Sequence, residues 1–432
     1  MDFNEDFLHY IWKFRLFKLL SIKTEDGDFL EISSVGNHNM HAGPDFESAK
    51  IKIGETVWVG NVEVHLISSD WIVHKHQTDN AYDNVILHVV YKHTQDVFRT
   101  NGTKIPVLVL ENLITAEVIS KYALLMRNIN WIPCEQLIGN VDQFHMESWL
   151  SRILMERLEK KVEQVTELLA QFNGSWDDAF YVMLARNFGF KVNALPFEML
   201  ARSLPPQLIA KNKDQSVKIE ALLFGQAGLL AQDPADDYPK TLLAEYGYLQ
   251  KKYNLEPVSS ASWKFMRMRP QNFPTIRLAQ FSALILRSNH LFSTILETRS
   301  VTDLIKIFDE LSVNSYWDTH YIFDSESNFS IKNLGKQSIN TILINTVAVF
   351  LFAYGKFFKL PNYITDALGL LETIPSESNE ILNRFKSLGL TANKAFTSQA
   401  LLQLKGSYCD QKKCLSCGIG IKLLSTNILA IK

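Results

Sequence analysis

Hydrophobic and polar positions divide the chain into two parts of different character. In the first part, apolar residues recur at helical spacing over residues 3–20, and strand-like runs follow. These runs are Phe29–Val35, Phe46–Ile53, Thr56–Leu66, Val85–Tyr91 and Ile105–Leu110. The run from Val85 is continuously apolar, which is typical of a strand buried in a parallel sheet, while Pro106 indicates an edge strand. Residues 70–84 have mixed spacing, which predicts a short helix or a structured loop. This order predicts a compact α/β domain over residues 1–115.

The pattern is almost entirely helical from Gln143 to about Leu404, with breaks at Pro205–Pro206, Pro234 and Pro361. We therefore expect a linker over residues 116–142, a larger all-α domain over 143–404, and a cysteine-containing tail over 405–432 packed on the rest. Residues 339–354 are the most apolar segment. They are short and interrupted by Asn340 and Asn345, so a buried helix is predicted rather than a membrane span.

Composition adds few constraints. Hydrophobic residues make up 47% of the chain and charged residues 21%, as in an ordinary soluble protein. The formal net charge of -2 gives no overall sign of a polyanion-binding protein, so any nucleic acid must be bound by a local basic patch. The acidic N-terminus lacks the pattern of a secretory signal, and four cysteines are too few for a disulfide framework. We expect a cytoplasmic protein, and the sequence does not indicate its oligomeric state.

Residues 36–76 concentrate acids and histidines. The turn Gly54-Glu55 between two strand-like runs would bring Asp45, Glu63 and His65 to one end of a hairpin, where Glu63 and His65 share a face of their strand. Such a group suits a hard divalent cation held by carboxylates beside a base that orients water. The alternative is ordinary turn chemistry at Asp45 and a solvated strand face for the other two residues.

This pattern resembles the PD-(D/E)XK nuclease superfamily. Pro44-Asp45 is followed, after seventeen intervening residues, by Glu63-x-His65 on the next strand, and the order of elements agrees with that superfamily. The longer string from Gly43-Pro44-Asp45-Phe46 through Val62-Glu63-Val64-His65 also resembles a bacterial family of unknown function, over the full chain.

The superfamily resemblance implies a nuclease that acts on DNA or RNA and depends on Mg²⁺ or Mn²⁺. Asp45, Glu63 and the carbonyl oxygen of Val64 would bind the metal, and Glu5 would supply an outer carboxylate. His65 stands where the motif has a lysine, and it would place or deprotonate the attacking water, or join the metal shell. The replacement also leaves open a catalytically inactive, nuclease-like protein that binds nucleic acid or serves in assembly.

Other histidines offer a different site. His74 and His76 together with His38 or His41 could bind a transition metal such as zinc, which would indicate a hydrolase of another class. The alternative is a set of loop histidines with ordinary hydrogen bonds. His88 lies in an apolar run, where a hydrogen-bonded core residue is expected.

A basic segment lies far along the chain, between residues 263 and 277. Lys264, Arg267, Arg269 and Arg277 are interleaved there with Trp263, a combination suited to phosphate contact and base stacking. The alternative is a loop that packs its aromatic residues and pairs its arginines with acids.

The cysteines form the last candidate site. Cys409, Cys414 and Cys417 follow a C-x4-C-x2-C pattern, and Cys134 could supply a fourth ligand. This spacing predicts bound Zn²⁺, or an iron–sulfur cluster of the kind that some nucleases of the superfamily carry. The alternative is four free thiols.

Overall fold

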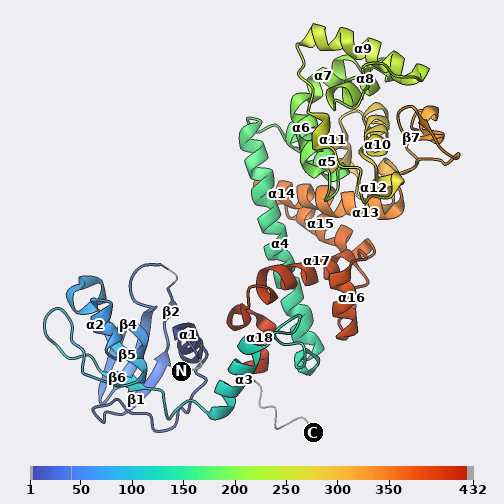
Figure 1. Ribbon diagram of the computed structural model, residues 1–432. Coiled ribbons are helices and arrows are strands. Elements are labelled where there is room, and N and C mark those ends of the chain that lie inside the picture. Colours follow the sequence, from blue (N-terminus) through green and yellow to red (C-terminus); the bar gives the residue numbers. More distant parts are fainter. Residues whose placement is uncertain (1–2, 40, 426–432) are drawn as a thin grey trace. The chain divides into compact units, whose positions relative to one another are not determined.

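A computed structural model describes residues 3–39 and 41–425 of the chain (Figure 1). The chain forms two compact units, which are described separately below. The first contains the residues up to Trp149 and those from Leu404 onward, and the second contains Leu150–Gln403. The first unit is therefore built from both ends of the chain.

A mixed sheet organises the first unit. Its strands are β1 (Leu30–Ser34), β2 (Asn37–His38), β3 (Phe46–Ile53), β4 (Thr56–Ile67), β5 (Val85–Lys92) and β6 (Val107–Val109). They lie in the order β1-β3-β4-β5-β6, with β2 also paired to β3. The pairs formed by β3 are antiparallel, whereas β4, β5 and β6 are parallel to one another. The predicted α/β class is confirmed, and β6, which follows Pro106, ends the order.

Local sequence explains the central strands. β3 and β4 join through the two-residue turn Gly54-Glu55, with Ile53 paired to Thr56, and Gly54 takes the positive φ of 58° that such a turn requires. β5 is buried at six consecutive positions because it has a parallel neighbour on each side.

The connection from β4 to β5 is a series of short helical turns rather than one helix. It consists of α2 (Asp70–Val73), η1 (His76–Thr78) and η2 (Asn80–Tyr82). Trp71 anchors it: the ring is fully buried in a cluster with Val85, Val90 and other apolar residues, and its Nε1 donates to the carbonyl oxygen of Phe98 at 3.1 Å. This anchor fixes the path of the histidines that follow.

Helix α1 (Glu5–Phe14) packs against β4 through an apolar face that includes Phe7, Ile11 and Trp12. The rest of the unit consists of α3 (Ala116–Arg127), η3 (Ile138–Asn140), η8 (Leu404–Cys409), η9 (Cys414–Ser416) and α18 (Gly418–Ser425). Residues 116–142, which the sequence pattern treats as a linker, thus contain helical turns of this same unit.

The second unit is helical apart from a short hairpin of β7 (His320–Ile322) and β8 (Ser325–Glu326). Its long first helix, α4 (Gln143–Gln171), begins within the first unit. The helices that follow are α5 (Trp176–Phe188), α6 (Ala194–Ser203), α7 (Pro206–Lys211), α8 (Ser216–Gln226), α9 (Asp237–Tyr253), η4 (Ser260–Ser262), η5 (Pro270–Asn272), α10 (Pro274–Arg287), α11 (Leu291–Glu297), α12 (Val301–Phe308), η6 (Ser315–Asp318), α13 (Lys336–Ile342), η7 (Leu343–Val347), α14 (Ala348–Phe358), α15 (Pro361–Thr373), α16 (Glu380–Ser387) and α17 (Ala395–Gln403). The larger helical part is therefore confirmed.

The predicted helix breaks also hold. α7 begins at Pro206 and α15 begins at Pro361. Proline is favoured at the first position of a helix, because the amide hydrogen that it lacks has no partner there. Pro234 lies between α8 and α9. The apolar segment becomes the continuous helix Lys336–Phe358. By length and composition it is the one helix among residues 3–39 and 41–425 that could cross a membrane, but 67% of its apolar window is buried inside the protein, as in a core helix of a soluble protein.

Candidate metal centre

The β3–β4 pair brings two acids together. Phe46 is paired with Val62, so Asp45 and Glu63 lie opposite one another at the start of β3. The Asp45 N–H donates to Glu63 Oε2 at 3.1 Å, and the Val64 N–H donates to Asp45 Oδ2 at 3.0 Å. These two bonds hold both carboxylates in fixed positions at one end of the hairpin.

Helix α1 adds two groups from its polar face. Glu5 and His9 lie one helical turn apart, and His9 Nε2 is 3.1 Å from Asp45 Oδ2. Burial raises the pKa of Glu5 to about 7, with His9 opposing the rise and the charges of Asp45 and Glu63 adding to it. Burial lowers the pKa of His9, but the hydrogen bond and charge of Asp45 outweigh that effect and raise it overall.

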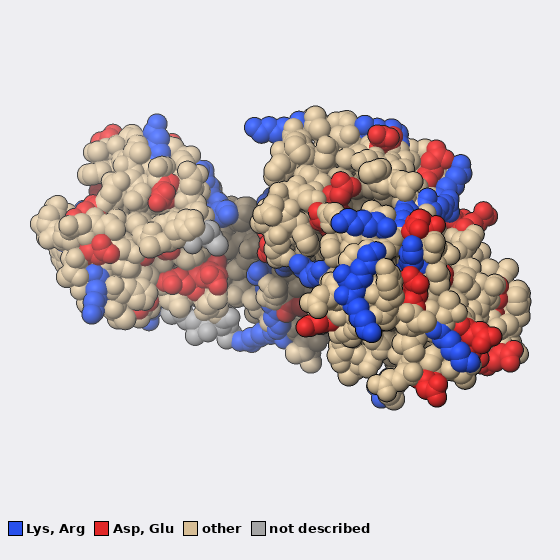
Figure 2. Space-filling view, turned by 90° about the horizontal axis from the view of Figure 1, so that it is seen from above, with Lys and Arg blue, Asp and Glu red and all other residues tan. Residues whose placement is uncertain are grey.

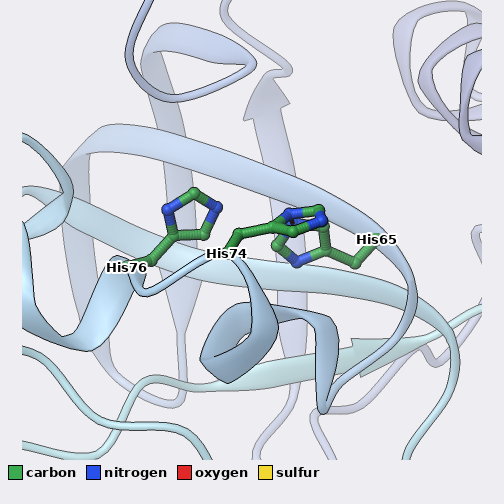
Figure 3. A group of neighbouring side chains, drawn as sticks. All are labelled: His65, His74 and His76. Carbon is green, nitrogen blue, oxygen red and sulfur yellow. Dashed lines mark hydrogen bonds between the residues drawn. The ribbon is translucent and has the colours of Figure 1, made fainter.

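Three imidazoles gather next to Glu63: those of His65 and His76 contact its carboxylate, and that of His74 contacts His65. His65 lies on β4, and His74 and His76 flank Lys75, whose positive φ of 65° turns the chain between them. His74 Nδ1 is 3.1 Å from His65 Nε2, while Glu63 Oε1 is 3.2 Å from His76 Nε2 and 3.5 Å from His65 Nε2. Within the described part of the chain, these histidines are the one group of three metal-ligating side chains whose ligand atoms all lie within 4.8 Å of one another (Figure 3).

A fourth imidazole supports His65 from behind. His88 of β5 is fully buried, and its Nε2 lies 2.9 Å from His65 Nδ1. Burial lowers the pKa of His65 to about 2 and that of His88 to about 3, with neighbouring imidazoles adding to both shifts. Both rings are therefore neutral, which is the form of histidine that binds metals.

The site is mostly closed to solvent. His65 is 1% exposed, Glu63 5% and His76 8%, whereas His74 is exposed. Burial raises the pKa of Glu63 against the opposing effect of its hydrogen bond to His76. Water and any substrate would therefore reach the group from the side of His74.

The structure brings together Glu5, Asp45, Glu63 and His65, which were the predicted catalytic set. Asp45 accepts a hydrogen bond from the N–H of Val64, and the role of the Val64 carbonyl oxygen as a metal ligand stays a prediction. His38 stacks on Phe46 with ring centroids 4.9 Å apart, and His41 is exposed. The predicted grouping of His38 or His41 with His74 and His76 does not form, and His65 takes that place.

Sequence reasoning did not select His9, and it assigned His88 a core role. The signal for His9 was its spacing of four residues from Glu5 on an amphipathic helix. His88 carried no local signal, because its contact with His65 depends on the register of β4 and β5, in which Glu63 pairs with His88.

The basic segment lies in the second unit, and two of its members point inward. Trp263 is buried and its Nε1 donates to the carbonyl oxygen of Ala227 at 2.7 Å. Arg277 is 5% exposed and donates to Asn272, Gln280 and Ser338. Those two side chains serve the packing of that unit. The exposed basic side chains of the segment are Lys264, Arg267 and Arg269.

On the side of the molecule shown in Figure 2, Lys and Arg are interspersed with Asp and Glu. This matches the formal net charge of -2, so contacts with a polyanion would have to be local.

The cysteines all lie in the first unit. Cys134 and the three tail cysteines are buried and form no disulfide, and all four line one small cavity. The two segments predicted to share a metal site therefore do meet.

Comparison with curated proteins and with solved structures returns no match. A family model described as "Protein of unknown function (DUF2851)" matches residues 5–380. This range contains Glu5 and the acid–histidine group, which consists of Asp45, Glu63, His65, His74 and His76. Nothing in these matches confirms the resemblance to PD-(D/E)XK nucleases, which stays a prediction. Because the match covers most of the chain, the protein belongs to the DUF2851 family of unknown function.

Proposed function

We propose that this protein is a divalent-metal-dependent phosphodiesterase that acts on nucleic acid. The observation that carries the proposal is the meeting of Glu63 with His65, His74 and His76 beside Asp45. This group lies at the end of the β3–β4 hairpin, where the PD-(D/E)XK resemblance expects the metal and the attacking water.

The donor atoms have spacings that suit one metal ion. Four ligands about 2.1 Å from a tetrahedral ion lie about 3.4 Å from one another. Glu63 Oε1 lies 3.2 Å from His76 Nε2 and 3.5 Å from His65 Nε2, and ligand nitrogens of His65 and His76 lie within 4.8 Å of each other, which leaves a fourth position for water. Little rearrangement would be needed for these atoms to bind an ion.

The donor types bear on the identity of the metal. Imidazole nitrogens with one carboxylate favour Zn²⁺ or Mn²⁺, whereas Mg²⁺ prefers oxygen ligands. Asp45 and Glu63 supply such oxygens, so Mg²⁺ is the second choice. A divalent cation bound here would supply a more acidic water and a positive charge against the phosphate.

The protein groups then have separate tasks. Glu63, His65 and His76 would hold the ion. The Nε2 atom of His88 would orient the His65 ring through its contact with His65 Nδ1. His65 has protein partners at both ring nitrogens and almost no exposure, which favours a ligand role over direct contact with the attacking water. His74, the exposed member, would face water and substrate.

A second function is favoured by the same nitrogen-rich set. A zinc hydrolase acting on a different ester or amide would use the same ligands, since the chemistry of a metal-bound water is not restricted to phosphodiesters. A protein that binds nucleic acid without cleaving it is the remaining alternative.

The test is cleavage of single- and double-stranded DNA and RNA by the full-length protein, with Mg²⁺, Mn²⁺ or Zn²⁺ added to chelator-treated protein. We expect cleavage with at least one ion, and a loss of roughly 100-fold or more in Glu63→Gln, beyond the effect usual for an outer-sphere substitution. The matched control is His41→Ala, which removes an exposed histidine of the same region and should retain full activity.

Two results would contradict the proposal. Equal cleavage by wild type and Glu63→Gln would mean that a contaminant or another site is responsible. Tight metal binding without cleavage of any of these polymers would favour the zinc hydrolase or the non-cleaving protein, and a panel of non-nucleotide esters would separate those two.

A further inference from the structure

Every cysteine of the chain lies at one place in the first unit. Cys134 precedes η3, Cys409 ends η8, and Cys414 and Cys417 flank the tight turn of η9. Their side chains are 7% to 9% exposed, and all four line one cavity. From this arrangement we infer that the four thiols bind a single zinc ion that fastens the C-terminal part of the first unit to its N-terminal part. This inference does not depend on the proposed function.

The size of the cavity favours one ion. Its volume is about 10 Å³, close to the space of one water molecule. A single ion is smaller than an iron–sulfur cluster with its several metal and sulfide atoms, so binding it would need the smaller change in this space. The remaining lining side chains include Leu404, Tyr408 and Ile419, so the thiols are the soft donors that face this space.

The ligand set fits a closed structural site. Four cysteine thiolates at about 2.3 Å from zinc stand about 3.8 Å apart and leave no open position for catalysis. The Sγ atoms lie farther apart than this here, because the histidines are the one described group of three ligands within 4.8 Å. Rotation about the Cα–Cβ bonds would turn the thiols toward the centre, and each thiol would release its proton to solvent on binding.

The tail around these cysteines is tightly packed against the N-terminal part of the first unit. A Cβ on Gly418 of α18 would lie 2.6 Å from the ring of Trp149, so a side chain larger than that of glycine does not fit there. The Lys412 Nζ donates to the carbonyl oxygen of Met126 at 2.9 Å, and the Tyr10 hydroxyl donates to that of Ile421 at 3.3 Å. Through Tyr10 the tail contacts α1, the helix that carries Glu5 and His9.

The first measurement uses the wild-type, full-length protein. We expect elemental analysis to find zinc that chelation at neutral pH removes slowly and that a thiol-specific mercurial releases. Replacement by Co²⁺ should give the near-ultraviolet charge-transfer absorption of thiolate ligands. A brown protein containing iron and acid-labile sulfide would overturn the assignment to zinc, and so would four freely reactive thiols with no bound metal.

Variants then locate the ion. Cys414→Ser and Cys134→Ser should each lower the zinc content by one ion per chain and abolish the cobalt–thiolate band. Ser416→Ala is the matched control, because this exposed residue lies between two of the ligands and should keep both signals. His74→Ala should also keep them, which separates this site from the acid–histidine group. Unchanged zinc in both cysteine variants would refute the inference, and the wild-type measurements decide the matter if those variants do not fold.

Discussion

Both carboxylate oxygens of Glu63 make contacts within the acid–histidine group. Oε2 accepts the Asp45 N–H, and Oε1 faces His65 and His76. His65 is held in turn by His88, whose Nε2 lies 2.9 Å from His65 Nδ1. At the residue scale the site is thus a chain of contacts, in which His88 fixes the orientation of His65 and His65 contacts Glu63.

This arrangement predicts that His88→Leu weakens metal binding without disturbing the fold. Leucine fills a similar buried volume but removes the partner of His65 Nδ1, so the affinity for Zn²⁺ or Mn²⁺ should fall by about 10- to 100-fold. Isothermal titration calorimetry measures the affinity, and circular dichroism checks the fold. An unchanged affinity would mean that packing alone orients His65.

At the scale of elements, close helix packing in the second unit depends on particular glycines. A Cβ at Gly225 of α8 would lie 2.1 Å from the ring of Tyr246 in α9. The Tyr246 hydroxyl also donates to Gln226 Oε1 at 2.8 Å, so the ring has little freedom to move away. By contrast, a Cβ at Gly247 of α9 would meet nothing within 4 Å.

Two alanine substitutions should therefore have opposite effects. Gly225→Ala should lower the free energy of unfolding of the second unit by about 1–3 kcal/mol through overpacking. Gly247→Ala should raise it by about 0.5–1 kcal/mol, because alanine loses less backbone entropy in a helix. Urea unfolding followed by circular dichroism compares the two, and a shift in the same direction for both would contradict this account of α8 and α9.

Helix α4 carries Lys161, whose amine is buried, so its charged form is disfavoured. The Lys161 Nζ donates to Asn345 Oδ1 at 2.8 Å, where burial and then the charge of Arg157 lower its pKa to about 7. In the unfolded chain the same amine titrates at about pH 10.4. Between these values the unfolded state binds more protons than the folded state, so stability rises with pH over this range.

We therefore expect the wild type to gain stability relative to Lys161→Met as the pH rises from about 7 to about 10. Below that range both states are protonated, and the difference between the proteins should be constant. Unfolding midpoints measured at several pH values report this difference. A difference that does not change with pH would show that the Lys161 amine keeps its ordinary pKa.

At the scale of the whole molecule, the first unit needs both ends of the chain. The tail covers Cys134, and its Tyr408 packs edge-to-face on Trp149 with ring centroids 5.3 Å apart. The carbonyl oxygen of Ile421 in the tail also accepts a hydrogen bond from the Tyr10 hydroxyl. The second unit draws on neither end, since it consists of residues 150–403.

A chain that ends at Gln403 should consequently lose the stability of its first unit and keep that of its second. Hydrogen exchange followed by mass spectrometry should show faster exchange in α1 and the sheet, with the protection of α5–α17 unchanged. Equal protection of the sheet in the truncated and full-length chains would contradict this dependence on the tail.

The predictions that succeeded depend on neighbours in sequence. Alternating residues, the turn Gly54-Glu55 and the prolines encode strands, a hairpin and helix ends. The hairpin in turn determines that Asp45 meets Glu63, which contacts His65 on the same strand. The residue types at these positions and their local spacing were enough to predict the strands and the hairpin, because strand period and turn geometry act over only a few residues.

Only the tertiary structure decided which distant residues share a site. Sequence spacing could not reveal that His9 contacts Asp45, that His76 contacts Glu63, or that His74 and His88 both contact His65. Nor could it reveal that Arg277 and Trp263 point inward. Those outcomes depend on how α1 packs on β4, on the register of β4 with β5, and on a connection anchored by the burial of Trp71. Apolar burial drives such packing without direction, so its result is set by the whole fold and not by any local stretch of the chain.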